Sequence, residues 1–337
     1  PLRRARMRSC MRMMTTTIST KMKRTKSPTT MMSDSSSSIP SKNKTLTYFL
    51  ICSVIWGLTW IAIKFQINAI NGSVAVFYRF FFASLVMFGL CFLNRENLKY
   101  SPKMHFRFFS QGFFMFCLNF VLTYWATSMA TSALVALAFT SLIFFNMFGA
   151  KIFLKIPFEK KVFYGAAISF FGMGLISFNE YDHIASQPLS VWGFALSVLA
   201  TLSASAGNLI STNNRRLKVP ILANNAWGML YGSLLTLIFC LITQKDFTVH
   251  LSQSFLISFL YLSLFGSVLS FWSYLKLIEI VGPAKAAFTS VLSPVIALAV
   301  STVFENLSWN IYLVLGVLFC LLGNFVALVR FDKKTTT

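Results

Sequence analysis

Apolar and polar residues alternate along this chain in long blocks. From Leu46 onward, apolar runs of about 18–23 residues, enough to cross roughly 30 Å of hydrocarbon as helices, are separated by short polar connections. The pattern predicts an all-α integral membrane protein with ten transmembrane helices. Their approximate bounds are 46–67, 74–93, 106–127, 131–152, 161–179, 190–211, 222–243, 253–275, 284–304 and 309–330.

The Lys and Arg residues fall almost entirely on one side of this arrangement. With the N-terminal segment placed in the cytoplasm, 27 of the 30 lie in that segment, at the C-terminal end or in connections on the same side. The opposite connections hold Lys245 and four acids, Glu180, Asp182, Asp246 and Glu305. This bias obeys the positive-inside rule, and one missed helix would reverse it for every later loop. We therefore expect a multi-pass protein of the cell (inner) membrane with both termini cytoplasmic.

The chain also contains an internal repeat. Gly165 and Gly172 stand seven apart in one apolar run, and Gly316 and Gly323 stand seven apart 151 residues later. Each copy would hold five helices, an odd number, so the second copy enters the membrane from the opposite face and the repeats are inverted. The predicted five-helix halves are 46–180 and 188–331.

The composition further limits the classes of protein to which this chain could belong. Charged residues make up 12% of the chain, against roughly 25% in soluble domains. The net charge of +21 comes from the N-terminal segment and the loops, so we do not expect nucleic acid as a partner. Residues 1–45 carry eleven Lys or Arg and one acid, with no apolar run for a cleavable signal. We expect a disordered basic cytoplasmic tail there, with an organelle transit peptide or a mis-assigned start as alternatives.

Several kinds of chemistry are disfavoured. The six cysteines and three histidines are scattered, so we expect no metal site and no cofactor. No nucleophile–base pair and no phosphate-binding P-loop occurs, so we expect neither an enzyme nor an ATP-driven pump. No carboxylate falls in the centre of a predicted helix. This disfavours carboxylate-based proton coupling and favours facilitated diffusion or exchange.

Trp56, Trp60 and Lys64 stand four apart in the first predicted helix and share one of its faces. This face could form a cavity wall in which two indoles stack an organic substrate near a cation. The alternative is that the Trp rings pack between helices and that Lys64 snorkels to the interface. We favour the cavity for the two Trp residues and the interface for Lys64.

Arg79 lies in the second predicted helix, five or six residues from its outer end. A guanidinium in a membrane helix is costly and normally faces the interior or an aqueous cavity. Being planar with five donors, it could hold a carboxylate or phosphate through two hydrogen bonds. A structural arginine bound to backbone carbonyls, or one that snorkels, is the alternative.

Other polar and aromatic residues recur near the membrane centre, where an unpaired amide is expensive and is expected to face the interior. They are Asn119, Tyr124, Trp125, Asn146, Asn208, Asn225, Trp227, Tyr231, Trp272 and Tyr274. Inter-helix hydrogen bonding is the alternative to substrate contact. The predicted substrate-binding residues are Trp56, Trp60, Arg79, Asn119, Tyr124, Trp227, Tyr231, Trp272 and Tyr274.

The second half carries a family-like pattern. Residues 275–328 contain Gly-Pro-Ala, then Pro294, Glu305, Gly316 and Gly323 in that order. With ten helices, an inverted repeat, an early Trp-Gly and an arginine in the second helix, the chain resembles the drug/metabolite transporter (DMT) superfamily, EamA type, over about residues 46–330.

The first half departs from the family pattern. Ile143 stands where the second half has Pro294, and the terminal Glu is displaced, with Glu159 as its candidate. A proline inside a helix frees a carbonyl and permits a bend, so the two halves are not expected to bend alike at this position. The pattern marks the fold better than the substrate.

The resemblance implies a central cavity lined by the first four helices of each half, with the fifth and tenth helices peripheral and the glycine pairs acting in packing. It implies a secondary transporter that exports or exchanges an amino acid or related metabolite by alternating access. Some relatives import nucleotide-like or sulfonium metabolites instead. We expect a small-molecule substrate with a carboxylate for Arg79, the lipid bilayer as surroundings, and a monomer or homodimer.

Two other classes remain open. A channel or lipid-moving protein would need a continuous polar path, against which the aromatic-rich helices argue. A non-transporting receptor or scaffold would use the basic tail to touch anionic lipid.

Overall fold

The computed structural model describes residues 42–67, 69–130, 132–157, 159–178, 189–304 and 309–328. The predicted tail lies outside these ranges, except that residues 42–45 begin the first helix, slightly before the predicted start at 46. The side chains of Trp60 and Lys64 lie outside the described part, although their backbone is helical.

The predicted apolar runs form helices. The first half contains α2 (Lys42–Ile67), α3 (Gly72–Leu93), α4 (Pro102–Gln111), the π-helix η2 (Gly112–Leu118), α5 (Asn119–Thr127), α6 (Ser132–Thr140), α7 (Leu142–Leu154) and α8 (Lys160–Phe178). The second half contains α10 (Ser190–Arg216), α11 (Ile221–Ile242), α12 (Gln253–Leu260), the π-helix η3 (Tyr261–Leu269), α13 (Ser270–Val281), α14 (Pro283–Ala286), α15 (Thr289–Phe304) and α16 (Ile311–Leu328). Within the described residues, nine helical runs from α3 onward are long and apolar enough to cross a membrane. The 26-residue α2 precedes them.

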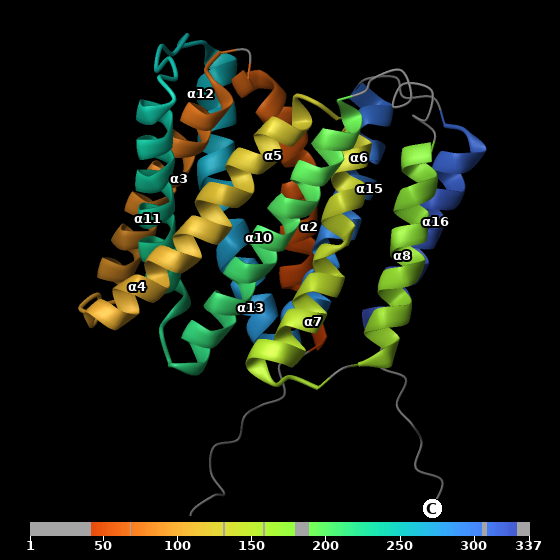
Figure 1. The fold of residues 1–337 in the computed structure, drawn as a ribbon, viewed down its shortest axis with the longest axis horizontal. Coiled ribbons are helices and arrows are strands. Elements are labelled where there is room, and N and C mark those ends of the chain that lie inside the picture. Colours follow the sequence, from red (N-terminus) through yellow and green to blue (C-terminus); the bar gives the residue numbers. More distant parts are fainter. Residues whose placement is uncertain are drawn as a thin grey trace, which may run out of the picture. The chain divides into compact units, whose positions relative to one another are not determined.

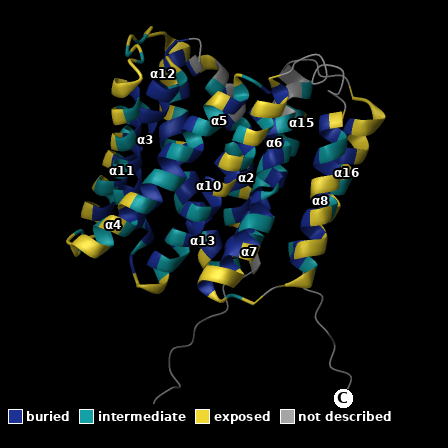
Figure 2. Ribbon diagram, in the orientation of Figure 1, coloured by how far each residue is buried: buried dark blue, intermediate teal, exposed yellow. Residues whose placement is uncertain are grey.

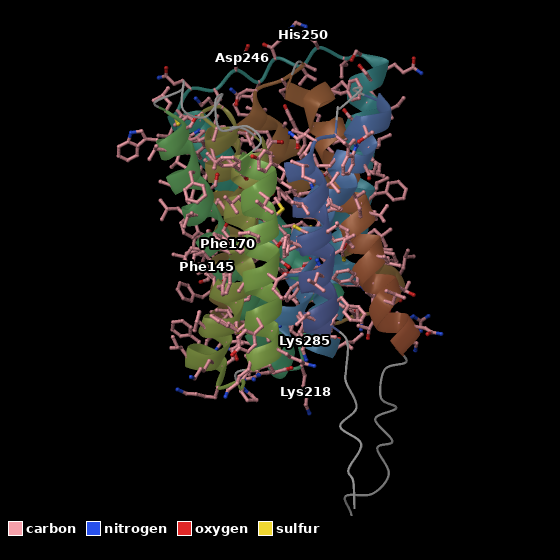
Figure 3. All side chains as sticks on the ribbon, turned by 90° about the vertical axis from the view of Figure 1, so that its right-hand side faces the viewer. Phe145, Phe170, Lys218, Asp246, His250 and Lys285 are labelled. Atoms are coloured by element: carbon pink, nitrogen blue, oxygen red, sulfur yellow. The ribbon has the colours of Figure 1, made fainter. Side chains whose placement is uncertain are left out.

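The loops gather at two ends of the helical bundle, named here after one residue each (Figure 3). The Lys218 end carries Lys218 and Lys285, and the Asp246 end carries Asp246 and His250. Because helices alternate in direction, α2 starts at the Lys218 end and α3 starts at the Asp246 end (Figure 1). A residue's depth in the bundle therefore follows from its place in its helix.

Helices α8 and α16 pair along one edge of the bundle (Figure 1). A Cβ on Gly172 would lie 2.6 Å from the carbonyl oxygen of Gly316, and one on Gly165 would lie 2.6 Å from that of Gly323. Only glycine permits this approach, because the neighbouring atom is backbone that cannot move alone. The outward faces of both helices carry exposed aromatic and aliphatic side chains, whereas buried residues run through the bundle centre (Figure 2).

Contacts also join positions that the repeat relates to each other. The Ser290 hydroxyl donates to the Phe139 carbonyl oxygen at 3.3 Å, and the Cys320 thiol donates to the Ser169 carbonyl oxygen at 3.7 Å. Both pairs are 151 residues apart, the offset of the glycine pairs. A two-fold axis between the halves would place such equivalent positions against each other.

Polar contacts cross the Lys218 end of the bundle. The Lys285 ammonium lies 2.8 Å from a Glu159 carboxylate oxygen, and Arg216 donates to the Leu154 carbonyl oxygen at 2.7 Å. Deeper, the Asn146 amide donates to the Pro283 carbonyl oxygen at 3.0 Å. These contacts tie α7 and the start of α8 to α10 and α14.

Candidate functional site

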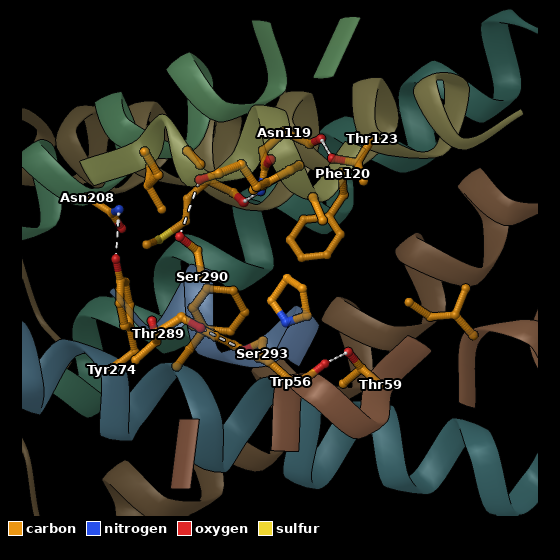
Figure 4. Close-up of a pocket in the computed structure, with 18 of the residues that line it drawn as sticks. Trp56, Thr59, Asn119, Phe120, Thr123, Asn208, Tyr274, Thr289, Ser290 and Ser293 are labelled. Atoms are coloured by element: carbon orange, nitrogen blue, oxygen red, sulfur yellow. Dashed lines mark hydrogen bonds between the residues drawn. The ribbon is translucent and has the colours of Figure 1, made fainter. Parts of the chain in front are cut away.

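A cavity lies in the middle of the bundle and extends toward the Asp246 end. Its volume is about 200 Å³. Helices from both halves line it, and most of its wall is apolar. The lining residues include Trp56, Thr59, Arg79, Asn119, Phe120, Thr123, Tyr124, Phe139, Asn208, Phe271, Tyr274, Thr289, Ser290, Ser293 and Pro294, most of which Figure 4 draws.

Arg79 supplies the cavity's cation. Its side chain is 3% exposed, and its guanidinium carbon lies 5.3 Å and 5.4 Å from the ring centres of Phe80 and Phe120. Nε donates to the Ser267 hydroxyl at 2.8 Å and Nη2 donates to the Gly266 carbonyl oxygen at 3.1 Å. Among the described residues, no carboxylate lies within ion-pairing distance of it. The guanidinium is therefore fixed in place but keeps an unneutralised charge, which attracts an anion.

Both groups that anchor Arg79, the Gly266 carbonyl and the Ser267 hydroxyl, lie on the π-helix η3. In a π-helix the backbone hydrogen bonds run from residue i to i+5, which changes which carbonyls are available to side chains. The Gly266 carbonyl oxygen accepts from Arg79 and also from the Trp56 indole nitrogen, at 3.2 Å. One backbone atom thus joins α2 and α3 and orients both the indole and the guanidinium.

Trp56 forms an aromatic wall with the second half. Its ring centre lies 5.4 Å from that of Phe271 and 5.1 Å from that of Tyr274. Figure 4 places Trp56, Thr59 and Ser293 on one side of the cavity and Asn119, Phe120 and Thr123 on the other. An organic group between these walls would contact aromatic faces on both sides.

Polar side chains form the cavity floor toward the Lys218 end. The Asn208 amide donates to the Tyr274 hydroxyl at 3.1 Å, drawn as a dashed line in Figure 4, and lies 3.5 Å from the Asn146 side-chain oxygen. The Asn208 side-chain oxygen is buried and has no partner among the described residues. This floor is uncharged, so it would position a substrate through hydrogen bonds.

Two further polar atoms near the cavity have no partner in the described part of the chain. The Asn119 side-chain oxygen and the Tyr124 hydroxyl are both buried without a hydrogen-bond partner in the described structure. Leaving such groups unpaired costs about 1–3 kcal/mol each. A bound substrate or water would remove this cost.

The predicted site residues do not all lie in one place. Trp56, Arg79, Asn119, Tyr124 and Tyr274 line the cavity together. Trp227, Tyr231 and Trp272 do not line it. Trp227 and Tyr231 stack on each other near His105, whose Nδ1 lies 3.0 Å from the Tyr231 hydroxyl, and Trp272 packs edge-on against Tyr48.

Sequence reasoning missed several lining residues. Thr59, Phe120, Thr123, Phe139, Phe271, Ser290 and Ser293 were not among the predicted site residues, and Asn208 was noted only as a polar residue near the membrane centre. A signal existed for some of them. Thr123 stands four after Asn119, and Phe120 stands four before Tyr124, so each pair shares a helix face.

Gly266→Ala should impair this site without removing any of its functional groups. The new Cβ would lie 3.2 Å from the Arg79 Nη2 and 3.2 Å from the Thr59 side chain, so the guanidinium must shift. A misplacement of 1 Å can cost about a hundredfold in activity, so the smaller shift expected here should cost about severalfold. Transport should fall by about that factor, while Gly89→Ala, which meets nothing within 4 Å, should leave it unchanged.

Comparisons with known proteins agree with this architecture. The model of the EamA-like transporter family matches twice, at residues 43–178 and 191–329. Protein PagO of Salmonella typhimurium is 21% identical over 86% of this chain and 94% of its own length. The uncharacterized inner membrane transporter YedA of Escherichia coli is 24% identical over 79% of this chain and 85% of its own length.

A solved crystal structure shares the fold, with a TM-score of 0.70 at 14% identity, covering 86% of this chain and 97% of the other. The two family matches together span most of the chain. Members of this family are transporters and not enzymes. The chain therefore belongs to the EamA-like transporter family and is a multi-pass membrane transporter.

Proposed function

We propose that this protein is a secondary carrier that moves a small organic molecule bearing a carboxylate, such as an amino acid or related metabolite, by alternating access. The observation that carries the proposal is the buried Arg79 guanidinium, which faces a cavity and pairs with no carboxylate among the described residues. The substrate carboxylate would supply the missing charge through two hydrogen bonds. Trp56, Phe120 and Phe271 would hold the organic body.

The proposed topology is ten transmembrane helices in two inverted halves of five, with both termini in the cytoplasm. The nine membrane-length runs plus α2, the two family matches and the contacts between equivalent positions support it. The Lys218 end, with its basic loops, would then face the cytoplasm. The name of YedA supports an inner membrane location.

The distribution of contacts supports a carrier over a pore. The cavity extends from the bundle centre toward the Asp246 end, whereas ion pairs and hydrogen bonds cross the Lys218 end. This is the arrangement expected for the outward-facing state of a carrier, which opens one side at a time. A channel needs a continuous polar path instead.

The substrate would be identified by comparing metabolites in cells with and without the protein. A compound that changes is then tested with purified protein in liposomes. We expect saturable flux that unlabelled compound on the opposite side accelerates, because exchange returns a loaded carrier faster than an empty one. Flux that rises linearly with concentration and shows no counter-exchange would contradict a carrier.

A further inference from the structure

A second polar cluster lies in the half of the bundle nearer the Lys218 end. Asn214, in the last turn of α10, donates to Gln111 at 3.3 Å and to Asn224 at 2.9 Å, and Asn224 donates to the Ser211 hydroxyl at 2.9 Å. All four side chains are completely buried. We refer to these four residues as the amide cluster.

The amide cluster is not fully paired. The Gln111 side-chain nitrogen and the Asn214 side-chain oxygen have no hydrogen-bond partner among the described residues. One is a donor and the other an acceptor, and each would cost about 1–3 kcal/mol of stability if it were left without a hydrogen-bond partner. A purely structural cluster would gain stability by closing its own hydrogen bonds, so these two groups point to a further partner.

The repeat places the counterpart of Arg79 beside this cluster. In the second helix of each half, equivalent positions are 149 apart. Helix α3 starts at Gly72 and α11 at Ile221, and the left-handed residues after them are Arg95 and Gln244. From the third helix the offset is 151, since Ser101 caps α4 and Ser252 caps α12.

These offsets give Arg79 the counterpart Gly228, and Ser267 the counterpart Phe116. The two counterparts are in contact, as Arg79 and Ser267 are, because a Cβ on Gly228 would lie 3.2 Å from the Phe116 ring. It would also lie 3.2 Å from the unpaired Gln111 nitrogen. The second half therefore has a glycine where the first half has a guanidinium, and the neutral Gln111 amide of α4 lies beside that glycine.

We propose that the amide cluster is a second polar subsite of the transport path, which receives the substrate when the Lys218 end opens. The inference rests on the proposed alternating access, in which inverted halves exchange roles, so that Gly228, the counterpart of Arg79, would face the path when the Lys218 end opens. The Gln111 amide lies beside Gly228. With a donor on Gln111 and an acceptor on Asn214, the subsite fits groups that both accept and donate, such as the polar end of an amino acid or a carboxamide. Lacking a charge, it would hold an anion more weakly than Arg79 does.

The test is whether the cluster becomes accessible from the Lys218 end. Ser211→Cys is nearly isosteric, and it would be made in a background in which the six native cysteines are replaced. The probe is a membrane-impermeant cationic methanethiosulfonate, applied to right-side-out and inside-out vesicles. Modification of Ser211→Cys should be at least about tenfold faster in inside-out vesicles, because each cavity of a carrier opens to one side.

Three control variants establish how the labelling rates are to be interpreted. Lys218→Cys reports access to the exposed loop, and Thr59→Cys should react only in right-side-out vesicles, because Thr59 lines the cavity toward the Asp246 end. Ser84→Cys, buried on α3 with its hydroxyl bonded within its own helix, should react from neither side.

Two results would overturn the subsite. One is no reaction of Ser211→Cys or Gln111→Cys in inside-out vesicles where Lys218→Cys reacts, and the other is faster reaction from the opposite side. Gln111→Cys keeps the test decisive if Ser211→Cys does not fold. The proposed carrier function is judged separately, through the Arg79 variants and counter-exchange, so the subsite can fail while the carrier stands.

Discussion

Arg79→Ala should abolish most transport while leaving the protein in the membrane. The substitution removes the only cation among the described residues that line the cavity, together with its two donors for a substrate carboxylate. A hydrogen bond to a charged group contributes about 1.5–3 kcal/mol, so uptake at subsaturating substrate should fall at least about tenfold. The measurement is initial uptake of the identified metabolite into liposomes, normalised to inserted protein.

Two companion variants make this result specific. Arg79→Lys keeps the charge but loses the planar pair of donors, so it should recover part of the activity. Arg107→Ala, on α4 near the Lys218 end and outside the cavity lining, should transport normally. Unchanged uptake by Arg79→Ala would remove Arg79 from the substrate site.

Gly172→Leu should destabilise the protein more than most single substitutions. Any side chain there meets the backbone of α16, since a Cβ would lie 2.6 Å from the Gly316 oxygen and 2.8 Å from the Cys320 nitrogen. Overpacking of this kind costs about 1–3 kcal/mol and can cost more when two backbones must separate. The apparent unfolding temperature in detergent should fall by at least about 5 °C.

Gly174→Leu is the matched control. Gly174 lies on the same helix two residues away, and a Cβ there meets nothing within 4 Å. Leucine favours helix by up to about 1 kcal/mol over glycine, so this variant should be as stable as the parent or slightly more stable. Equal losses of stability in both variants would show that the effect of Gly172→Leu does not come from the α8–α16 contact.

The helices were largely predictable from sequence because a membrane-crossing helix needs a long apolar run, and such runs are visible without knowledge of packing. Their internal breaks were not. The π-helices η2 and η3 interrupt the third and eighth predicted runs, in stretches whose sequence shows no proline or charge. Nothing in the local sequence marks the change from i+4 to i+5 hydrogen bonds, so these segments could not be predicted.

The candidate site was predictable only in part for a related reason. A polar residue in an apolar run is expected to face the interior, and Arg79 and Asn119 lie beside a cavity. An aromatic side chain packs well against lipid, protein or substrate. Its place in an apolar run therefore does not show which of these it contacts. Trp227 on α11 faces α3 and α4, where it meets Phe88 and His105 instead of the cavity.

The Arg79 guanidinium has no charged counterpart in the amide cluster, and this affects how the membrane potential acts on transport. Arg79 is fixed to the η3 backbone, and the amide cluster carries no charge, so the main charge moved during transport would be that of the substrate. The membrane potential acts on each such charge with about 2.3 kcal/mol per 100 mV. With the cytoplasm negative, a monoanionic substrate would be driven outward by voltage alone. A zwitterion would feel no such force, and its concentration gradient would set the direction of net flow.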